Sequence, residues 1–308
     1  MNEKPRLDRR ELLRALAAAG SAAMLGPTLA VAQSSPLLTR RIPKGGEELP
    51  VVGLGSWGTF NVGDDQAGRD HCTEVIKAFL GAGGRTIDSS PMYGSSQQTI
   101  GYAYERLNRP ASLWSADKVW INNGAEGPRQ IEESRRAWRI PRFDLLQVHN
   151  LMAWEAHLPT LFAMKAAGKL RYVGITTSHG RRHEEIEQVM RSQPIDFVQV
   201  TYNIADREVE ERILPLAHDK GIAVIINRPF QRGDLLREFG GKPLPAWASE
   251  IDCTSWPQFL LKFIVSHPAV TMAIPATSSV QHLRENVGAA RGRMPDEGMR
   301  RRMVKAVS

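Results

Sequence analysis

Cysteine is scarce in this sequence: only Cys72 and Cys253 occur in 308 residues. Neither belongs to a Cys-x-x-Cys pair, and a core of this size needs no disulfide, so we expect both thiols to be free. Long apolar runs are also missing, because the most lipid-like segment, residues 15–32, is mostly Ala and Gly and contains Pro27. That segment is too weakly apolar to predict a membrane-spanning helix.

Charge of one sign is not concentrated either. The formal net charge is +7, and no basic stripe interleaved with aromatic residues occurs, so we expect no nucleic-acid partner. The cluster Arg300–Arg302 is expected on a solvated helix face. His179 and His183 are four residues apart, but Gly180 and a loop setting argue against a helical metal site, and no complete ligand set occurs elsewhere. We therefore predict no metal.

The N-terminus has the pattern of an export signal. Arg9 and Arg10 precede a mildly apolar Ala/Gly stretch that ends in an Ala-x-Ala cleavage site at Ala32. This order predicts a twin-arginine signal peptide over residues 1–32, a periplasmic protein of residues 33–308, and the twin-arginine export machinery as a partner. After cleavage we expect no stable membrane insertion and a monomer. The alternative is an amphipathic N-terminal helix that stays attached.

Downstream, short apolar segments alternate with amphipathic ones. The candidate strands are Val51–Leu54, Arg85–Asp88, Leu113–Val119, Asp144–His149, Tyr172–Thr176, Phe197–Thr201, Ala223–Asn227 and Thr271–Ile274. Amphipathic stretches lie near residues 70–82, 95–107, 128–139, 155–167, 183–191, 208–220, 255–266 and 279–290, with a final helix over Pro295–Val307. Eight such units predict one closed (β/α)8 TIM barrel, with a β-hairpin over Arg41–Pro50 as a plug at its N-terminal end.

A dinucleotide-binding open sheet is the competing interpretation. The segment Gly53–Gly58 is a literal G-x-G-x-x-G after a strand. That motif needs a helix that begins at its third glycine, whereas residues 60–65 have loop composition, and Asp88 comes late for the acid that binds the ribose. The barrel is therefore the preferred fold.

Four ionisable residues follow consecutive candidate strands. Asp88 ends the second strand, Tyr93 lies across a Ser-Ser-Pro turn from it, Lys118 closes the third strand and His149 the fourth. Separately each has an ordinary structural explanation, as a turn residue, a surface lysine or a core histidine. Together they should face one another over the C-terminal mouth of the barrel, where active sites of this fold lie.

These residues resemble the aldo-keto reductases over nearly all of residues 33–308. Residues 87–94 resemble the Asp-x-x-x-x-Tyr-Gly signature of that family, and Lys118 and His149 match its lysine and histidine. Gly168–Ile175 resembles the segment before the fifth strand, and Ile274–Thr277 with Leu283–Asn286 resembles the adenosine-end motif. The resemblance implies an NAD(P)H-dependent reductase of aldehydes or ketones. The alternative is a non-catalytic or sensory nicotinamide-binding protein on the same barrel.

Carbonyl reduction explains why such groups are needed. A free phenol is a poor acid at neutral pH, so we expect Lys118 to lower the pKa of the proton donor Tyr93 and Asp88 to hold the ammonium in place. His149 is expected to orient the carbonyl oxygen by a hydrogen bond.

The resemblance also implies a cofactor site. Its residues are Gly55, Ser56, Trp57, Thr176, Thr177, Gln199, Arg228, Pro229, Phe230, Gly233, Leu235, Ile274, Pro275, Ala276, Thr277, His282, Glu285 and Asn286. Asn227 stands where many members have an aromatic that stacks on nicotinamide. Ala276 and His282 stand where the family commonly has a lysine and an arginine for the 2′-phosphate, so NADP(H) is favoured only weakly and NAD(H) is usable. We expect an open mouth walled by Trp57, Trp120 and Trp154, and Trp138 in the core.

Overall fold

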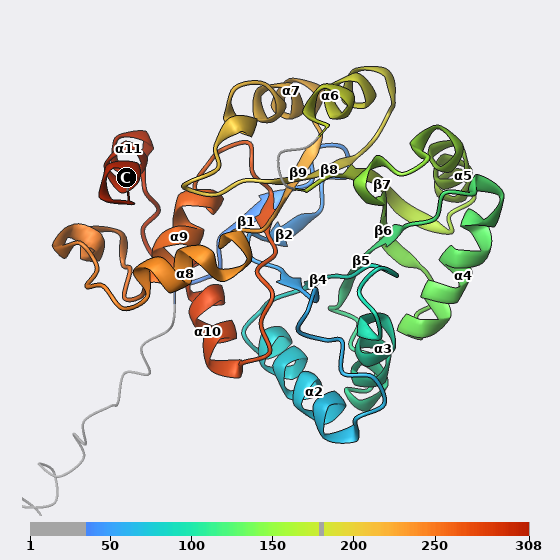
Figure 1. Ribbon diagram of the computed structural model, residues 1–308, viewed down its shortest axis with the longest axis horizontal. Helices are drawn as coiled ribbons and strands as arrows, with labels where there is room; N and C mark the ends of the chain where they lie inside the picture. Colours follow the sequence, from blue (N-terminus) through green and yellow to red (C-terminus); the bar gives the residue numbers. More distant parts are fainter. Residues whose placement is uncertain (1–34, 179–181, 308) are drawn as a thin grey trace, which may run out of the picture. The chain divides into compact units, whose positions relative to one another are not determined.

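The structure of the protein is a computed structural model that describes residues 35–178 and 182–307 (Figure 1). The expected signal peptide and His179 lie outside these residues. Eight parallel strands form one sheet in the order β10-β9-β8-β7-β6-β5-β4-β3. Their bounds are β3 Leu54–Gly55, β4 Thr86–Asp88, β5 Trp114–Val119, β6 Phe143–Val148, β7 Leu170–Thr176, β8 Phe197–Thr201, β9 Ala223–Asn227 and β10 Met272–Ala273.

The first and last strands meet and close the sheet. Val52 bridges to Ala273 and Gly55 to Ala276, both in parallel register, and the Gly53 amide donates to the Ala273 carbonyl at 2.8 Å. A Cβ atom on Gly55 would lie only 2.7 Å from the Ile274 carbonyl oxygen. Glycine at this seam therefore permits the close approach of the two backbones, and the predicted (β/α)8 barrel is confirmed.

The hairpin plugs the N-terminal end of the barrel as predicted. Strands β1 (Thr39–Arg41) and β2 (Glu48–Pro50) pair antiparallel. Ile42 and Leu49 are fully buried and belong to one apolar cluster with the aromatic side chains of the barrel interior, Trp114, Tyr172 and Phe197. This packing fills the bottom of the barrel and leaves the opposite mouth for function.

Helices surround the strands (Figure 1). Their bounds are α2 Gln66–Gly81, α3 Ser96–Arg106, α4 Gly127–Trp138, α5 Trp154–Ala166, α6 His183–Ser192, α7 Ile213–Lys220, α8 Asp234–Phe239, α9 Trp256–Val265, α10 Val280–Gly288 and α11 Glu297–Val307. Short 3-10 segments are η1 Gly124–Glu126, η2 His149–Leu151, η3 Glu208–Glu210, η4 Gln231–Gly233 and η5 Ala246–Ile251. Within the described ranges no helix combines the length and apolarity of a membrane span.

Element boundaries differ from the sequence prediction where capping or turns decide them. Helix α2 begins four residues earlier than predicted, because the Asp65 carboxylate accepts hydrogen bonds from the Ala67 and Gly68 amides and caps it. The predicted helix over 208–220 is divided into η3 and α7. Helix α8 and the 3-10 segment η5, both in the long connection after β9, were not predicted.

The expectation of a solvated face at Arg300–Arg302 is wrong for Arg300. Its side chain is buried, where it donates to the Tyr202 hydroxyl at 2.5 Å and pairs with Glu210 at 3.0 Å. The guanidinium also donates to the Phe263 carbonyl of α9. Through these charge-assisted hydrogen bonds the buried arginine connects α11 to α9 and to the segment after β8.

Candidate active site

A buried ion pair lies under the C-terminal mouth of the barrel. Lys118 of β5 donates to the Asp88 carboxylate at the end of β4 at 2.5 Å and to the Ser89 carbonyl at 2.7 Å. Lys118 is 0% exposed and Asp88 2%. Burial alone would lower the pKa of Lys118, but the Asp88 carboxylate and the other neighbouring groups outweigh it and raise that pKa. The ammonium is therefore charged and fixed in position.

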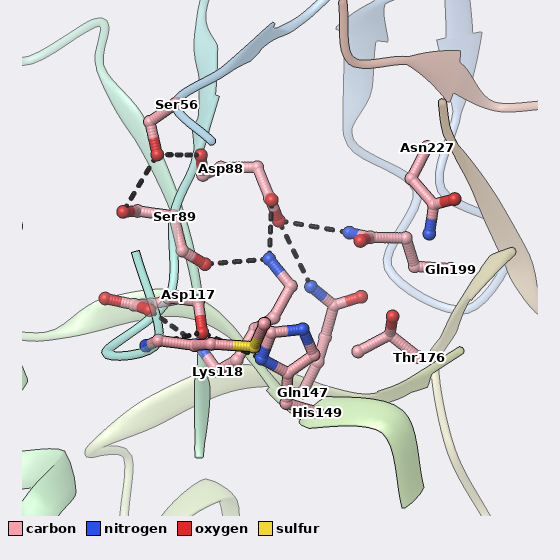
Figure 2. Close-up of polar contacts among 12 residues, drawn as sticks. Ser56, Asp88, Ser89, Asp117, Lys118, Gln147, His149, Thr176, Gln199 and Asn227 are labelled. Carbon is pink, nitrogen blue, oxygen red and sulfur yellow. Dashed lines mark hydrogen bonds and ion pairs between the residues drawn. The ribbon is translucent and has the colours of Figure 1, made fainter. Parts of the chain in front are cut away.

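Two amides complete the shell of the Asp88 carboxylate (Figure 2). Gln199 of β8 donates to Asp88 Oδ1 at 3.0 Å, and Gln147 of β6 donates to the same oxygen at 3.4 Å. Together with Lys118 these donors provide hydrogen bonds to both carboxylate oxygens of Asp88. Strands on both sides of the barrel thus converge on one carboxylate.

Tyr93 lies above this pair, in the turn between β4 and α3. Lys118 Nζ is 5.3 Å from the centroid of the Tyr93 ring, and the ring meets His149 edge-on at 5.8 Å between centroids. We expected Lys118 to lower the pKa of the phenol. Burial instead raises the pKa of Tyr93, and the charge of Lys118 offsets only part of the effect. Tyr93 therefore carries its proton at neutral pH.

His149 is a neutral ring at the mouth. Strand β6 ends at Val148, one residue earlier than predicted, and His149 begins η2. Its Nδ1 lies 2.8 Å from Ser90 Oγ. Burial and the nearby charge of Lys118 lower the pKa of His149 to about 2. Ser90 is not among the predicted site residues, although it lies in the turn directly after Asp88.

A second buried carboxylate, Asp117, lies on β5 next to Lys118. It accepts hydrogen bonds from Gln97 of α3 at 2.7 Å and from Trp138 of α4 at 2.5 Å, and from the Lys118 amide at 2.7 Å. Burial nevertheless raises the pKa of Asp117 to about 7. The side chain therefore links two helices to the strand that carries Lys118, and Trp138 lies in the core as predicted.

The mouth opens into two adjoining cavities, of about 560 and 700 Å³. They share Phe230, Leu236 and Ala276 as lining residues, so they form one elongated cleft. Tyr93 and His149 line the first cavity, whereas Glu285 and Asn286 line the second. We call these the catalytic end and the far end.

Nearly all predicted cofactor residues line this cleft. Those at the catalytic end are Gly55, Ser56, Trp57, Thr176, Thr177, Gln199, Arg228, Pro229, Phe230, Gly233, Ile274, Pro275 and Ala276. Those at the far end are Phe230, Ala276, Thr277, His282, Glu285 and Asn286. Leu235 does not line either cavity: its side chain is 3% exposed and packs in the core, whereas the next residue, Leu236, lines the cleft.

Only one of the three tryptophans expected at the mouth lines it. Trp57 is 47% exposed, and the Arg232 guanidinium lies 5.0 Å from its ring centroid. Trp120 does not line either cavity, and the Trp154 indole is turned to Glu185, to which it donates at 2.9 Å. The apolar rim is formed by Trp57 together with Met92, which is 42% exposed.

Asn227 has an internal role at the position where a stacking aromatic is common in the family. Its amide donates to the Thr177 carbonyl at 2.8 Å and its oxygen accepts from the Thr201 hydroxyl at 2.7 Å. Asn227 therefore joins the ends of β7, β8 and β9, and no flat apolar face is presented there.

The far end contains a lysine that the sequence analysis missed. Lys242 follows α8 and lines the cavity together with His282 and Thr277. The Trp256 indole donates to the Lys242 carbonyl at 2.8 Å and fixes the backbone there. No pattern near Lys242 marks it as a site residue, because only folding of the connection after β9 brings it opposite α10.

His183, the second histidine of the pair considered for a metal, begins α6. Its Nδ1 lies 2.9 Å from the Glu208 carboxylate. The ring is thus engaged by η3, away from the residues that line the cleft.

Sequence comparison decides the family. The profile of the Aldo/keto reductase family matches residues 51–303, most of the chain. This chain belongs to that family. The aldo-keto reductase resemblance stated above is thereby confirmed, over the barrel that carries the four residues Asp88, Tyr93, Lys118 and His149.

Individual aldo-keto reductases are similar over most of their length. The methylglyoxal reductase YeaE of Escherichia coli is 27% identical over 249 residues, which cover 79% of this chain and 86% of the relative. An NADH-specific methylglyoxal reductase of the same organism is 23% identical over 307 residues, which cover 81% and 93%. A crystal structure of an aldo/keto reductase from Klebsiella pneumoniae in complex with NADP and acetate superposes with a TM-score of 0.74 at 22% identity, and covers 87% of this chain and 94% of that one.

Proposed function

We propose that this aldo-keto reductase reduces the carbonyl group of an aldehyde or ketone to an alcohol, with Tyr93 as the proton donor. The observation that carries the proposal is a protonated phenol at the mouth of a cleft, placed over a fixed cation and beside a neutral imidazole. A nicotinamide dinucleotide supplies the hydride when it is bound. The elongated cleft, with polar groups at both ends, fits a group of that shape.

The residues of the site have separate tasks in this reaction. Tyr93 gives its proton to the carbonyl oxygen as negative charge develops there. Lys118 stabilises the phenolate that remains, and Asp88 holds the ammonium at 2.5 Å. Because His149 is neutral, its ring donates a hydrogen bond to the carbonyl oxygen without competing for the proton of Tyr93.

A substrate screen tests the proposal. Purified protein of residues 33–308 is assayed with NADPH and NADH against methylglyoxal, simple aldehydes and ketones, with methylglyoxal included because two relatives are named for it. The exposed rim of Trp57 and Met92 favours several small substrates over one. Cofactor binding without turnover of any carbonyl would contradict the proposal and favour the sensory alternative.

Cofactor choice depends on the far end of the cleft. The uncharged Ala276 and the exposed His282 give little fixed charge for a 2′-phosphate, but the basic side chain of Lys242 belongs to the lining of the same cavity. We infer that NADPH binds better than NADH by a modest factor and that NADH is usable. A structure from Klebsiella pneumoniae holds NADP and one relative is NADH-specific, so both cofactors occur among similar proteins.

Titration of both cofactors against single variants separates the contributions of Lys242 and His282. Lys242→Ala should then reduce the NADPH preference by about tenfold, since a charge-assisted hydrogen bond is worth about 1.5–3 kcal/mol, and Lys220→Ala, remote from the cleft, should not. A preference that neither Lys242→Ala nor His282→Ala changes would contradict this account.

Export is proposed on the sequence alone, from Arg9 and Arg10 ahead of a weakly apolar stretch. Replacing both arginines by lysine should keep the protein in the cytoplasm at precursor length, while Arg14→Lys in the same leader should still be exported. Mature periplasmic protein from the double variant would indicate another route. Fractionation and immunoblotting distinguish these outcomes.

A further inference from the structure

Ser90 makes a hydrogen bond to His149 that determines which ring nitrogen of the histidine carries the hydrogen. The hydroxyl is fully buried in the turn after Asp88, and its Oγ lies 2.8 Å from His149 Nδ1. The Met92 amide also donates to this oxygen, at 3.2 Å. Within the part of the chain that the structure describes, these are the two partners of Ser90 Oγ.

The two contacts decide which way the hydrogen bond runs. The Met92 amide can only donate, so it occupies a lone pair of Ser90 Oγ and leaves the hydroxyl proton in need of an acceptor. In the described residues, His149 Nδ1 is the acceptor within reach, and a buried hydroxyl proton without an acceptor is costly. If Nδ1 carried the hydrogen instead, the serine proton would point at no acceptor. Nδ1 of His149 is therefore the acceptor.

The opposite nitrogen follows from this assignment. A neutral imidazole carries one hydrogen, so an unprotonated Nδ1 places it on Nε2. His149 lines the cleft next to Tyr93, and in the described residues its Nε2 has no protein partner. The N–H is thus available to a bound ligand.

We propose that Ser90 is a positioning residue that holds His149 as the Nε2–H tautomer, so that this N–H donates to the substrate carbonyl oxygen beside the Tyr93 hydroxyl. Without the serine the ring can take the other tautomer, in which Nε2 is an acceptor and repels the oxygen lone pairs. The expected effect on kcat rests on the proposed carbonyl reduction, whereas the tautomer of His149 can be measured without turnover.

Nitrogen-15 NMR of the full barrel tests the tautomer directly. The protein is labelled at histidine, and the His149 signals are identified by their loss in His149→Gln. We expect a pyridine-type Nδ1 and a pyrrole-type Nε2 between pH 6 and 8. A pyrrole-type Nδ1 in the wild-type protein overturns the inference, even if no variant of Ser90 folds.

Ser90→Ala tests the consequence. We expect a larger fraction of the Nδ1–H tautomer and a loss of about fivefold in kcat, the size of one neutral hydrogen bond, with cofactor Kd unchanged. Ser134→Ala is the matched control, because it removes another buried hydroxyl, on α4, which accepts a hydrogen bond from Gln97 at 2.9 Å. This control should change neither kcat nor the tautomer of His149. Unchanged kcat and unchanged tautomer in Ser90→Ala overturn the proposal, whereas a wild-type Nε2–H tautomer in a protein that reduces no carbonyl refutes only the proposed function.

Discussion

Lys118→Met should destabilise the barrel strongly, because it leaves a buried carboxylate without its cation. In the variant Asp88 faces the Gln147 and Gln199 amides but no cation, at a site where its side chain is 2% exposed. Removing one partner of a buried ion pair costs about 3–5 kcal/mol, since the remaining charge is left without a counter-ion at a buried site. Equilibrium urea unfolding of the single variant should show a loss of this size in the free energy of unfolding.

Two further variants test whether the unpaired charge of Asp88 causes the loss of stability. Asp88→Asn in the Lys118→Met background removes the unpaired negative charge, so the double variant should regain most of the lost stability. Lys77→Met removes a cation from a pair with Glu74 in which both side chains are more than 60% exposed, and such pairs contribute about 0–1 kcal/mol. A cost for Lys118→Met below about 1 kcal/mol, or a double variant no more stable than the single one, would refute the reasoning.

Three other predictions concern stability. Gly55→Ala should cost about 1–3 kcal/mol in thermal unfolding, because its Cβ meets backbone at the barrel seam; Gly241→Ala, with open space around it, should not. Because burial raises the pKa of Asp117 to about 7, well above its unfolded value, the stability it contributes is lost as pH rises from about 4 to 7. The free energy of unfolding of Asp117→Asn, relative to that of the wild type, should therefore increase from pH 4 to 7. A difference that is constant over this range would contradict the prediction. Arg300→Met should cost about 3 kcal/mol and Arg301→Met almost nothing, since only Arg300 is buried; equal losses would show that the anchor of α11 is misassigned.

The barrel and its four central residues were predictable because both depend on local patterns. Apolar strand segments such as residues 197–201 and 223–227 stand out from the amphipathic stretches between them, and in a barrel all C-terminal strand ends meet at one mouth. Asp88, Lys118 and His149 could be placed together for that reason. Element boundaries depended on capping and turn geometry, and were less accurate.

What the sequence could not show depends on burial and on contacts distant along the chain. Lys118 is next to Tyr93 as expected, yet desolvation outweighs its charge and raises the pKa of the phenol. Lys242 lies at the far end of the cleft only because the irregular connection after β9 folds over it. Arg300 can be buried only because Tyr202 and Glu210 provide hydrogen-bond and ion-pair partners for it. None of these contacts can be read from a short sequence motif.

The most direct test of the central claim is the rate of reduction in Tyr93→Phe. The variant is mixed in a stopped-flow instrument as its preformed NADPH complex with a carbonyl compound that the wild-type protein reduces, and cofactor Kd is measured separately. Because general acid catalysis contributes about 10²–10⁴-fold, we predict a rate at least about 100-fold below the wild type with an unchanged Kd. A rate within about threefold of the wild type would contradict the assignment of Tyr93 as the proton donor.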